Sequence, residues 1–407
     1  MKTYLIPLIL LFLSMNVSLS QEITIGSRDT VYSDILEENR PLSIYFPPSY
    51  HYKKNQNYPV LYVLDGDYSF QYLTGLLELE ASISENIPEM ILVGISGKGS
   101  KTYKENCKPN IQGVKDSGNA DSVLAFIEKE LTPYIDKNYK TLDYKILAGH
   151  SIGGLFIVNA ALKKPKLFSN YIAISPALWW EENAINNVVN EVYEKNQLIV
   201  PDVYVSLADE KRMGVKEFLK LVGSEFKFKQ FENENHNSVG SPTYKWALRD
   251  IFKVWKFDKK YFDSASELEQ YHNSSSSFYN VPLPIAEGIL YITIIHILKN
   301  QPQEIEEVTR IINNNYPNSR TYFITLLASN AINQEDFEKA ENILVEGLQQ
   351  YPDSFEIYEK LAEVHLVQHQ NKKSQKEIQK AFELSKEQNV RQWRIEEIKV
   401  LMDYEKN

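Results

Sequence analysis

The chain has 407 residues, a length that favours two domains of ordinary size. Hydrophobic residues make up 43% and charged residues 24%, which is globular composition and excludes both a disordered chain and a polytopic membrane protein. The net charge is −10, so general nucleic-acid binding is disfavoured because an acidic surface repels the phosphate backbone.

The first 20 residues have the pattern of a secretion signal. Lys2 supplies a positive charge, Leu5–Val17 is an apolar run too short to span a bilayer, and Ser18 and Ser20 are the small residues of a cleavage site. We therefore expect an exported protein, periplasmic or extracellular, with no integral membrane segment after cleavage. An uncleaved N-terminal anchor is the alternative.

Residues 21–258 alternate strand-like and helix-like segments. Five continuous apolar runs predict strands at 59–64, 90–95, 142–147, 171–175 and 203–207. Unbroken apolar runs are typical of strands buried on both faces of a mainly parallel sheet. Helical patterns such as 121–135 lie between them, so we predict an α/β domain with helices on both faces of the sheet.

After about residue 258 the strand signal is lost and only helical periodicity continues. We expect 259–281, which contains a serine tract, to be a linker. We expect 282–407 to form an all-α domain.

The helical part also shows internal similarity. Leu327-Ala328 recurs as Leu361-Ala362, 34 residues later, and Tyr316–Ser319 recurs as Tyr351–Ser354. A helix–turn–helix period of this length predicts tetratricopeptide-like repeats. An ordinary helical bundle is the alternative.

The segment Gly149–Gly154 reads Gly-His-Ser-Ile-Gly-Gly and fits the pattern G-x-S-x-G. It follows a predicted strand and precedes an apolar helix start, which is the context that a nucleophile elbow requires. Glycines flank the serine where the sharp turn leaves no room for side chains. The pattern predicts Ser151 as a nucleophile, the alternative being a glycine-rich turn with a chance serine.

A serine nucleophile needs a base, and in this fold class the acid and then the histidine follow it along the chain. His236 lies in a polar loop after the strand-like segment 227–231, whereas His272 lies in the expected linker. We therefore predict His236 as the base. Asp209 and Glu210 both follow the fifth predicted strand, and we favour Asp209 as the acid that orients the histidine, with Glu210 as its competitor.

The oxyanion of an acyl transfer needs two backbone N–H donors. We predict the N–H groups of Ile152, directly after the nucleophile, and of Asp67, in the turn after the first apolar strand. Trp179 and Trp180 would line the substrate pocket, core packing being the alternative. The lysines of residues 98–108 would attract an anionic substrate, although solvated surface lysines are commoner.

These motifs resemble those of the esterase family of the α/β-hydrolase superfamily, which includes esterase D, the enterobactin esterases, the feruloyl esterase domains and the antigen 85 mycolyltransferases. The resemblance runs from about residue 42 to 252 and rests on Tyr62–Gly66, Phe126–Leu131, Gly149–Gly154, Ser175-Pro176, Trp179-Trp180 and His236–Val239. It implies an α/β-hydrolase fold and serine esterase activity. The family's functional positions fall on Ser151, His236, Asp209 or Glu210, Asp67 and Ile152. An esterase domain followed by a helical, tetratricopeptide-like tail is also similar to a set of exported bacterial hydrolases.

We therefore expect an exported serine esterase that hydrolyses a small-molecule or glycan-linked carboxylic ester through an acyl-enzyme, siderophore esters and acylated glycans being candidate substrates. We expect no cofactor, no metal and no nucleic-acid partner, and the single cysteine, Cys107, is a bystander to a far better supported serine. Two other hypotheses stay open. One is an interaction protein that recruits a partner through the helical region beside a vestigial hydrolase domain, and the other is an acyltransferase.

Overall fold

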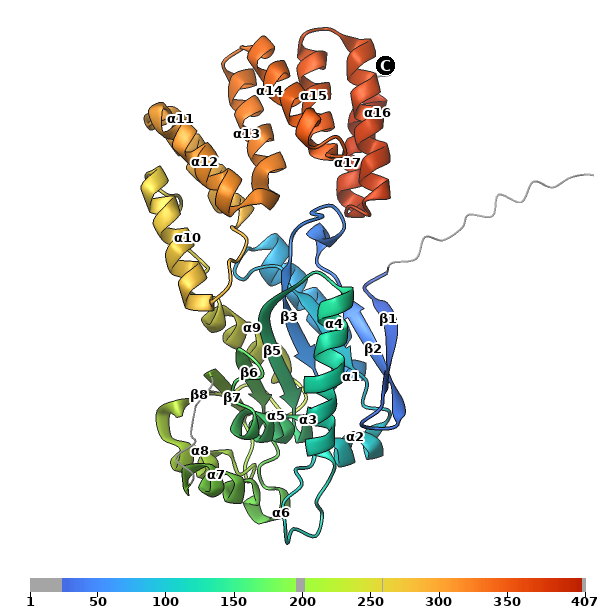
Figure 1. Cartoon of the computed structure of the whole chain (residues 1–407), viewed down its shortest axis with the longest axis vertical. Coiled ribbons are helices and arrows are strands. Elements are labelled where there is room, and N and C mark those ends of the chain that lie inside the picture. The colour runs from blue at the N-terminus through green and yellow to red at the C-terminus, as the bar shows by residue number, and fades with distance from the viewer. Residues whose placement is uncertain (1–23, 195–201, 258, 405–407) are drawn as a thin grey trace, which may run out of the picture.

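A computed structural model of the chain describes residues 24–194, 202–257 and 259–404 (Figure 1). The expected secretion signal, residues 1–20, lies outside the described residues. In the part that is described, no helix is both long enough and apolar enough to cross a membrane.

An eight-stranded sheet forms the centre of the N-terminal half of the described chain. Its strands are β1 (Ser27–Ser33), β2 (Glu38–Tyr45), β3 (Tyr58–Val63), β4 (Ile91–Ile95), β5 (Thr141–His150), β6 (Asn170–Ile174), β7 (Asp202–Ala208) and β8 (Phe226–Phe231). Their order is β1-β2-β4-β3-β5-β6-β7-β8, antiparallel from β1 to β4 and parallel from β4 to β8. The five predicted apolar runs are β3 to β7, and the predicted α/β class is confirmed.

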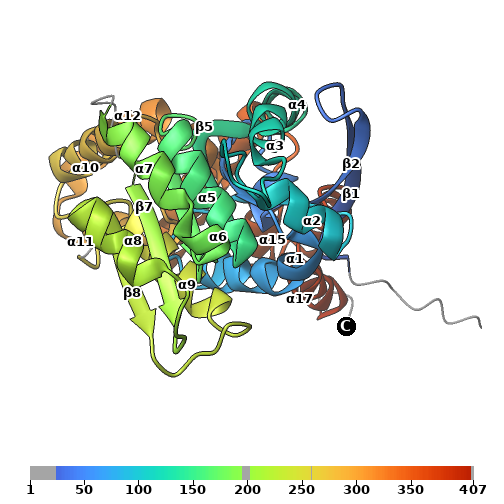
Figure 2. The ribbon, with the colours of Figure 1, turned by 90° about the horizontal axis from the view of Figure 1, so that it is seen from below.

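Helices cover both faces of this sheet, as Figure 2 shows. One face packs against α2 (Ser100–Cys107), the continuous element α3–η3–α4 (Ala120–Phe126, Ile127–Leu131, Thr132–Asn138), α5 (Ile152–Lys163), α7 (Ile185–Glu194) and α8 (Val215–Val222). The other face packs against α1 (Gly66–Leu77), its extension η2 (Glu78–Ile83), and α9 (Gly240–Ile251). Short turns are η1 (Pro48–Tyr50), α6 (Trp180–Asn183) and η4 (Gly223–Glu225). Burial on both faces explains why the central strands are apolar without alternation.

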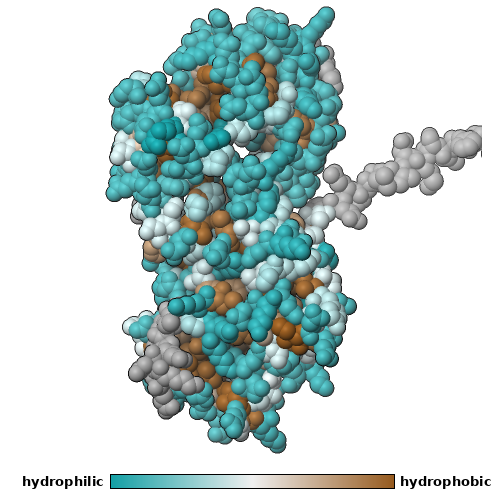
Figure 3. Space-filling view, in the orientation of Figure 1, coloured by the Kyte–Doolittle hydropathy of each residue, from teal (hydrophilic) through white to brown (hydrophobic). Residues whose placement is uncertain are grey.

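The C-terminal region that is described is entirely helical, as expected. Its elements are α10 (Ala265–Tyr279), α11 (Glu287–Asn300), η5 (Pro302–Glu304), α12 (Ile305–Asn315), η6 (Pro317–Ser319), α13 (Arg320–Asn333), α14 (Phe337–Gln350), α15 (Phe355–Val367), α16 (Asn371–Glu387) and α17 (Gln392–Tyr404). Helix α13 packs on α14 and α15 packs on α16, so two helical hairpins follow one another. Figure 3 shows hydrophobic residues between these helices on an otherwise mainly hydrophilic surface. The tetratricopeptide-like label stays a prediction.

The expected linker, 259–281, instead contains the 15-residue helix α10. Ser264 caps its N-terminus by accepting a hydrogen bond from the N–H of Glu267, three residues later, which is the spacing of a capping box. Leu268 packs into the core of the helical tail and Tyr279 packs into the core of the α/β domain. Serine is only a mediocre helix former, and these two apolar contacts outweigh its propensity. Helix α10 therefore joins the two cores instead of separating them.

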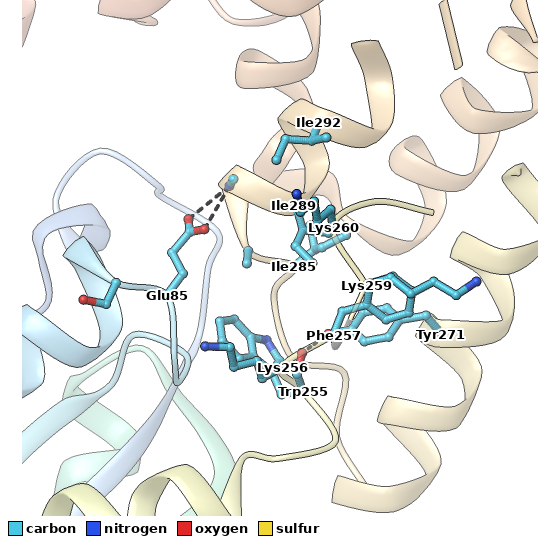
Figure 4. Close-up of a pocket in the computed structure, with 13 residues that line it drawn as sticks. Glu85, Trp255, Lys256, Phe257, Lys259, Lys260, Tyr271, Ile285, Ile289 and Ile292 are labelled. Atoms are coloured by element: carbon cyan, nitrogen blue, oxygen red, sulfur yellow. Dashed lines mark hydrogen bonds between the residues drawn. The ribbon is translucent and has the colours of Figure 1, made fainter. Parts of the chain in front are cut away.

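The helical tail docks on the end of the sheet at which the parallel strands begin (Figure 1). The loop before β3 supplies an ion pair from Lys53 to Glu287 and another from Lys54 to Asp353, at 2.8 Å. A crevice of about 290 Å³ lies at this junction. Figure 4 shows the residues that line it, among them Glu85, whose carboxylate accepts from the N–H of Gly288. The carboxyl ends of the parallel strands β3 to β8 lie at the opposite end of the sheet.

We expect Lys53→Met to destabilise the protein by about 2–3 kcal/mol, because it leaves Glu287 without its cation beside the carboxylates of Glu89 and Glu356. The side chain of Lys53 is only 14% exposed, whereas that of Lys54 is 65% exposed. The matched variant Lys54→Met should therefore cost less than about 1 kcal/mol. Urea unfolding of the two variants measures the difference, and equal losses would contradict this description of the junction.

Candidate active site

Ser151 lies at the sharp turn between β5 and α5. Its backbone has φ 58° and ψ −116°, a strained conformation for a residue with a side chain. A Cβ atom at Gly153 would lie 2.2 Å from the hydroxyl oxygen of Tyr103, and one at Gly149 would lie 2.8 Å from the backbone of Gly153. The obstacle at Gly149 is backbone, so this position requires glycine, whereas a side chain at Gly153 would have to displace the Tyr103 hydroxyl. The turn has the form that the G-x-S-x-G pattern predicts.

His236 lies in the loop between β8 and α9, which is where the sequence places the candidate base. Its Nδ1 atom is 2.7 Å from Oε1 of Glu210, in the loop after β7. The other carboxylate oxygen of Glu210 accepts a hydrogen bond of 2.7 Å from the hydroxyl of Ser175, at the end of β6. The Ser175 hydroxyl in turn accepts from the N–H of Ala208. Three neighbouring strand ends thus hold one carboxylate against one imidazole.

The preference for Asp209 as the acid is corrected by this geometry. The N–H of Asp209 donates to the carbonyl of Glu234 in the loop after β8, and the N–H of Glu210 donates to the carbonyl of Ala208 at 2.8 Å, so the chain turns at Asp209. The side chain of Asp209 is exposed, and that of the next residue, Glu210, is on the side of His236. Of the two neighbouring carboxylates, the one that lies against the histidine is therefore that of Glu210.

His150, the residue before the nucleophile, packs against the candidate base His236. Its ring centroid is 4.5 Å from that of His236. Burial, with a smaller contribution from the neighbouring His236, lowers the pKa of His150 to about 4. The imidazole is therefore neutral at pH 7 and adds no positive charge beneath His236.

This depressed pKa predicts a specific loss of stability in acid. An unfolded histidine binds its proton near pH 6.5, whereas folded His150 binds it only near pH 4, so stability falls as the pH drops through this interval. Between pH 7 and 4.5 we expect His150→Phe to lose about 2 kcal/mol less stability than the wild type. Urea unfolding at the two pH values measures this difference. Identical losses in both proteins would contradict it.

The two predicted oxyanion donors lie close to the nucleophile. Ile152 is the first residue of α5 and Asp67 is the second residue of α1. N–H groups in the first turn of a helix have no acceptor within the helix, so both are free to bind an oxyanion. Both residues line one cavity together with Ser151 and His236.

This cavity has a volume of about 410 Å³ and opens at the carboxyl ends of the strands. Among the described residues, its walls are formed by Asp65, Asp67, Tyr68, Gly97, Gly99, Ser100, Tyr103, Lys104, His150, Ser151, Ile152, His236 and Asn237. The loop before α2 and its first turn form one side, a contribution that the sequence showed only as a lysine-rich segment.

The two tryptophans predicted to line the substrate pocket do not do so. Trp180 is 3% exposed, and its indole N–H donates to Asp116 at 3.2 Å. Trp179 is 55% exposed on the surface. The sequence alternative, core packing, therefore holds for Trp180. Tyr68, which is 61% exposed, lines the cavity with an aromatic ring. The sequence did not predict this role, because Tyr68 lies one residue after the predicted turn at residues 65–67.

An α/β sheet with a serine at its nucleophile elbow and a histidine–carboxylate pair in the same cavity defines the class of α/β-hydrolases with a serine site. Residues 33–216 match the sequence model of a family described as "Putative esterase". Over these residues the α/β domain is similar to this esterase family, and the protein is a serine carboxylic-ester hydrolase.

Two curated relatives show the range of similarity. The ferri-bacillibactin esterase BesA of Bacillus subtilis is 26% identical over 268 residues, covering 58% of this chain and 92% of that protein. The siderophore triacetylfusarinine C esterase of Aspergillus fumigatus is 31% identical over 137 residues, covering 31% of this chain and 47% of that protein.

Solved structures share the fold. An IroE-like serine hydrolase from Shewanella oneidensis superimposes with a TM-score of 0.58 at 24% identity, covering 70% of this chain and 96% of its own. An uncharacterised protein from Capnocytophaga ochracea reaches a TM-score of 0.51 at 17% identity and covers 88% of this chain and 93% of its own. A match over 88% of the chain extends beyond the esterase domain, so part of the helical tail has a counterpart in that fold.

Proposed function

We propose that the protein hydrolyses its ester through a Ser151–His236–Glu210 triad. The observation that carries this proposal is the 2.7 Å contact between His236 and Glu210 in the cavity that Ser151 also lines. A carboxylate at Nδ1 selects the tautomer whose Nε2 can accept the proton of the serine hydroxyl.

The reaction then follows from the positions of these groups. Ser151 Oγ attacks the ester carbonyl while His236 takes its proton, and the carbonyl oxygen becomes negatively charged between the N–H groups of Ile152 and Asp67. Collapse of this intermediate releases the alcohol, which receives the proton from His236, and leaves an acyl group on Ser151. Water, deprotonated by His236, attacks this acyl-enzyme, and collapse of the second intermediate releases the acid while Ser151 Oγ receives the proton back from His236.

We infer that the substrate is a small-molecule ester of the siderophore kind. Support comes from two relatives that are named as siderophore or ferri-siderophore esterases, and from a cavity of small-molecule size. Hydrolysis of a panel of trilactone siderophores, acetylated glycans and feruloylated glycans by the purified protein tests this proposal. Preference for the glycan esters would contradict it, and transfer of the acyl group to an added alcohol would favour the acyltransferase hypothesis.

We further propose that the protein is exported and that the helical tail serves a protein partner, not the substrate. The pattern of the first 20 residues supports export. The tail lies at the end of the sheet opposite Ser151, and none of its described residues lines the 410 Å³ cavity. If the hydrolase domain were only a vestigial support for such a partner, a fluorophosphonate would fail to label Ser151 in the folded protein.

A further inference from the structure

The segment that follows β6 is bonded directly to the nucleophile. The N–H of Ser151 donates to the carbonyl of Ile174 at 2.9 Å, and the N–H of Ala177 donates to the carbonyl of Ser151, also at 2.9 Å. A Cβ atom at Gly154, in the first turn of α5, would lie 2.9 Å from Pro176, so the elbow and this segment are in close contact. The backbone of the segment therefore has a fixed position relative to the nucleophile.

Ser175, inside this segment, is fully buried, and its hydroxyl contacts both ends of the turn that carries the candidate acid. It accepts a hydrogen bond of 3.1 Å from the N–H of Ala208 and donates one of 2.7 Å to Oε2 of Glu210. This direction is fixed, because an N–H can only donate and a hydroxyl has a single proton. Oε1 of Glu210 lies 2.7 Å from Nδ1 of His236, and among the described residues the carboxylate has no third partner.

The backbone at Ser175 is strained. Its φ of 35° lies in the left-handed region, which is unfavourable for a residue with a side chain and is readily adopted by glycine. Strained residues persist where the surrounding structure holds them, and they cluster at functional sites. Glycine at this position would relieve the strain but would remove the hydroxyl, which is the part of Ser175 that contacts Glu210.

From these contacts we propose that Ser175 is the positioning residue that sets the acid of the triad relative to the nucleophile. Its backbone segment is bonded to Ser151 and its side chain is bonded to Glu210, so one residue connects two members of the triad that lie in different loops. Without the hydroxyl, the Glu210 carboxylate keeps only its contact with His236 and can rotate about it. The inference rests on the proposed triad and adds to it a residue that touches neither the substrate nor the reacting atoms.

Two replacements of Ser175 separate the hydroxyl from the backbone strain. We expect Ser175→Ala to lower kcat for 4-nitrophenyl acetate about 10- to 100-fold and to leave KM within about threefold, because a hydrogen bond to a charged group is lost at a distance from the substrate. Ser175→Gly should show the same loss of kcat, although it relieves the positive φ. Steady-state kinetics of the full chain measure both. Recovery of wild-type kcat in Ser175→Gly would assign the effect to the backbone and overturn the inference.

Ser206→Ala is the matched control, because it removes another fully buried hydroxyl, on the neighbouring strand β7. That hydroxyl lies 2.8 Å from the hydroxyl of Thr243 and does not contact Glu210. The N–H of Ser175 donates to the Ser206 carbonyl at 3.1 Å, a bond that alanine keeps, and more weakly to the hydroxyl at 3.4 Å. Ser206→Ala should lower the urea midpoint of unfolding but leave kcat within about threefold of the wild type. An equal loss of kcat in the Ser206 and Ser175 variants would indicate a structural effect only and would overturn the inference.

A double-mutant cycle shows whether Ser175 acts through Glu210. Where Glu210→Gln is already present, adding Ser175→Ala should lower kcat by less than about threefold, because the carboxylate that the hydroxyl orients is gone. A full further loss in the double variant would mean that Ser175 acts elsewhere and that the inference is wrong. If Glu210→Gln is impaired while Ser175→Ala has wild-type kcat, the positioning role alone is wrong. If Glu210→Gln is as active as the wild type, the proposed triad fails and the role of Ser175 falls with it.

Discussion

Replacing Ser151 by alanine is expected to lower kcat for a 4-nitrophenyl ester by about 10⁴-fold or more, because no other group at the elbow can form the acyl-enzyme. The backbone strain at this position persists with alanine, so the fold should be kept. Steady-state hydrolysis and circular dichroism of the same preparation measure both quantities.

The control for this variant is Cys107→Ala, which removes the only thiol in the chain. Burial raises the pKa of the Cys107 thiol, so it stays protonated and is a poor nucleophile. Its removal should change kcat by less than about threefold. Loss of activity in Cys107→Ala, together with retained activity in Ser151→Ala, would reverse the assignment of the nucleophile.

The second large effect distinguishes the two candidate acids. Glu210→Gln is expected to lower kcat by about 10³–10⁴-fold, because an uncharged amide at Nδ1 no longer stabilises the imidazolium or fixes its tautomer. Asp209→Asn, the matched change at the neighbouring exposed position, should leave kcat within about threefold of the wild type.

The pH dependence sharpens this comparison. In the wild type the carboxylate of Glu210 supports a protonated His236 during the reaction, so its removal should act on kcat far more than on KM. Kinetics of both variants from pH 6 to 9 provide the measurement. A severe loss of kcat in Asp209→Asn together with a mild loss in Glu210→Gln would instead identify Asp209 as the acid of the triad.

The sequence predicts the framework of this site well because its chemistry is local. A nucleophile elbow needs glycines within two residues of the serine, and Gly149 and Gly153 occupy these two positions around Ser151. The central strands are equally recognisable, since burial on both faces leaves unbroken apolar runs such as β3.

What the sequence could not decide depends on the direction of side chains after a strand ends. Asp209 and Glu210 are adjacent acids, and only the turn that the Glu210 N–H closes onto the carbonyl of Ala208 shows which of them lies against His236. The prediction that Trp179 and Trp180 line the substrate pocket was wrong for the same reason. Both follow β6, and the sequence does not show which of the two indoles is buried.

The helical region shows the same limit at larger scale. Periodicity identified helices in the tail but assigned 259–281 to a linker on account of its serines. The contacts of Leu268 and Tyr279, which decide that α10 forms, are made with residues far away in sequence. Intrinsic propensity gave the opposite answer because tertiary packing outweighs it.

The most direct test of this account is to identify the residue that a fluorophosphonate modifies in the folded protein. We expect one adduct per chain, on the peptide that contains Ser151, with labelling abolished in Ser151→Ala and slowed strongly in Glu210→Gln. No adduct in folded wild-type protein, or an adduct on any other residue, would contradict the assignment of Ser151 as the nucleophile.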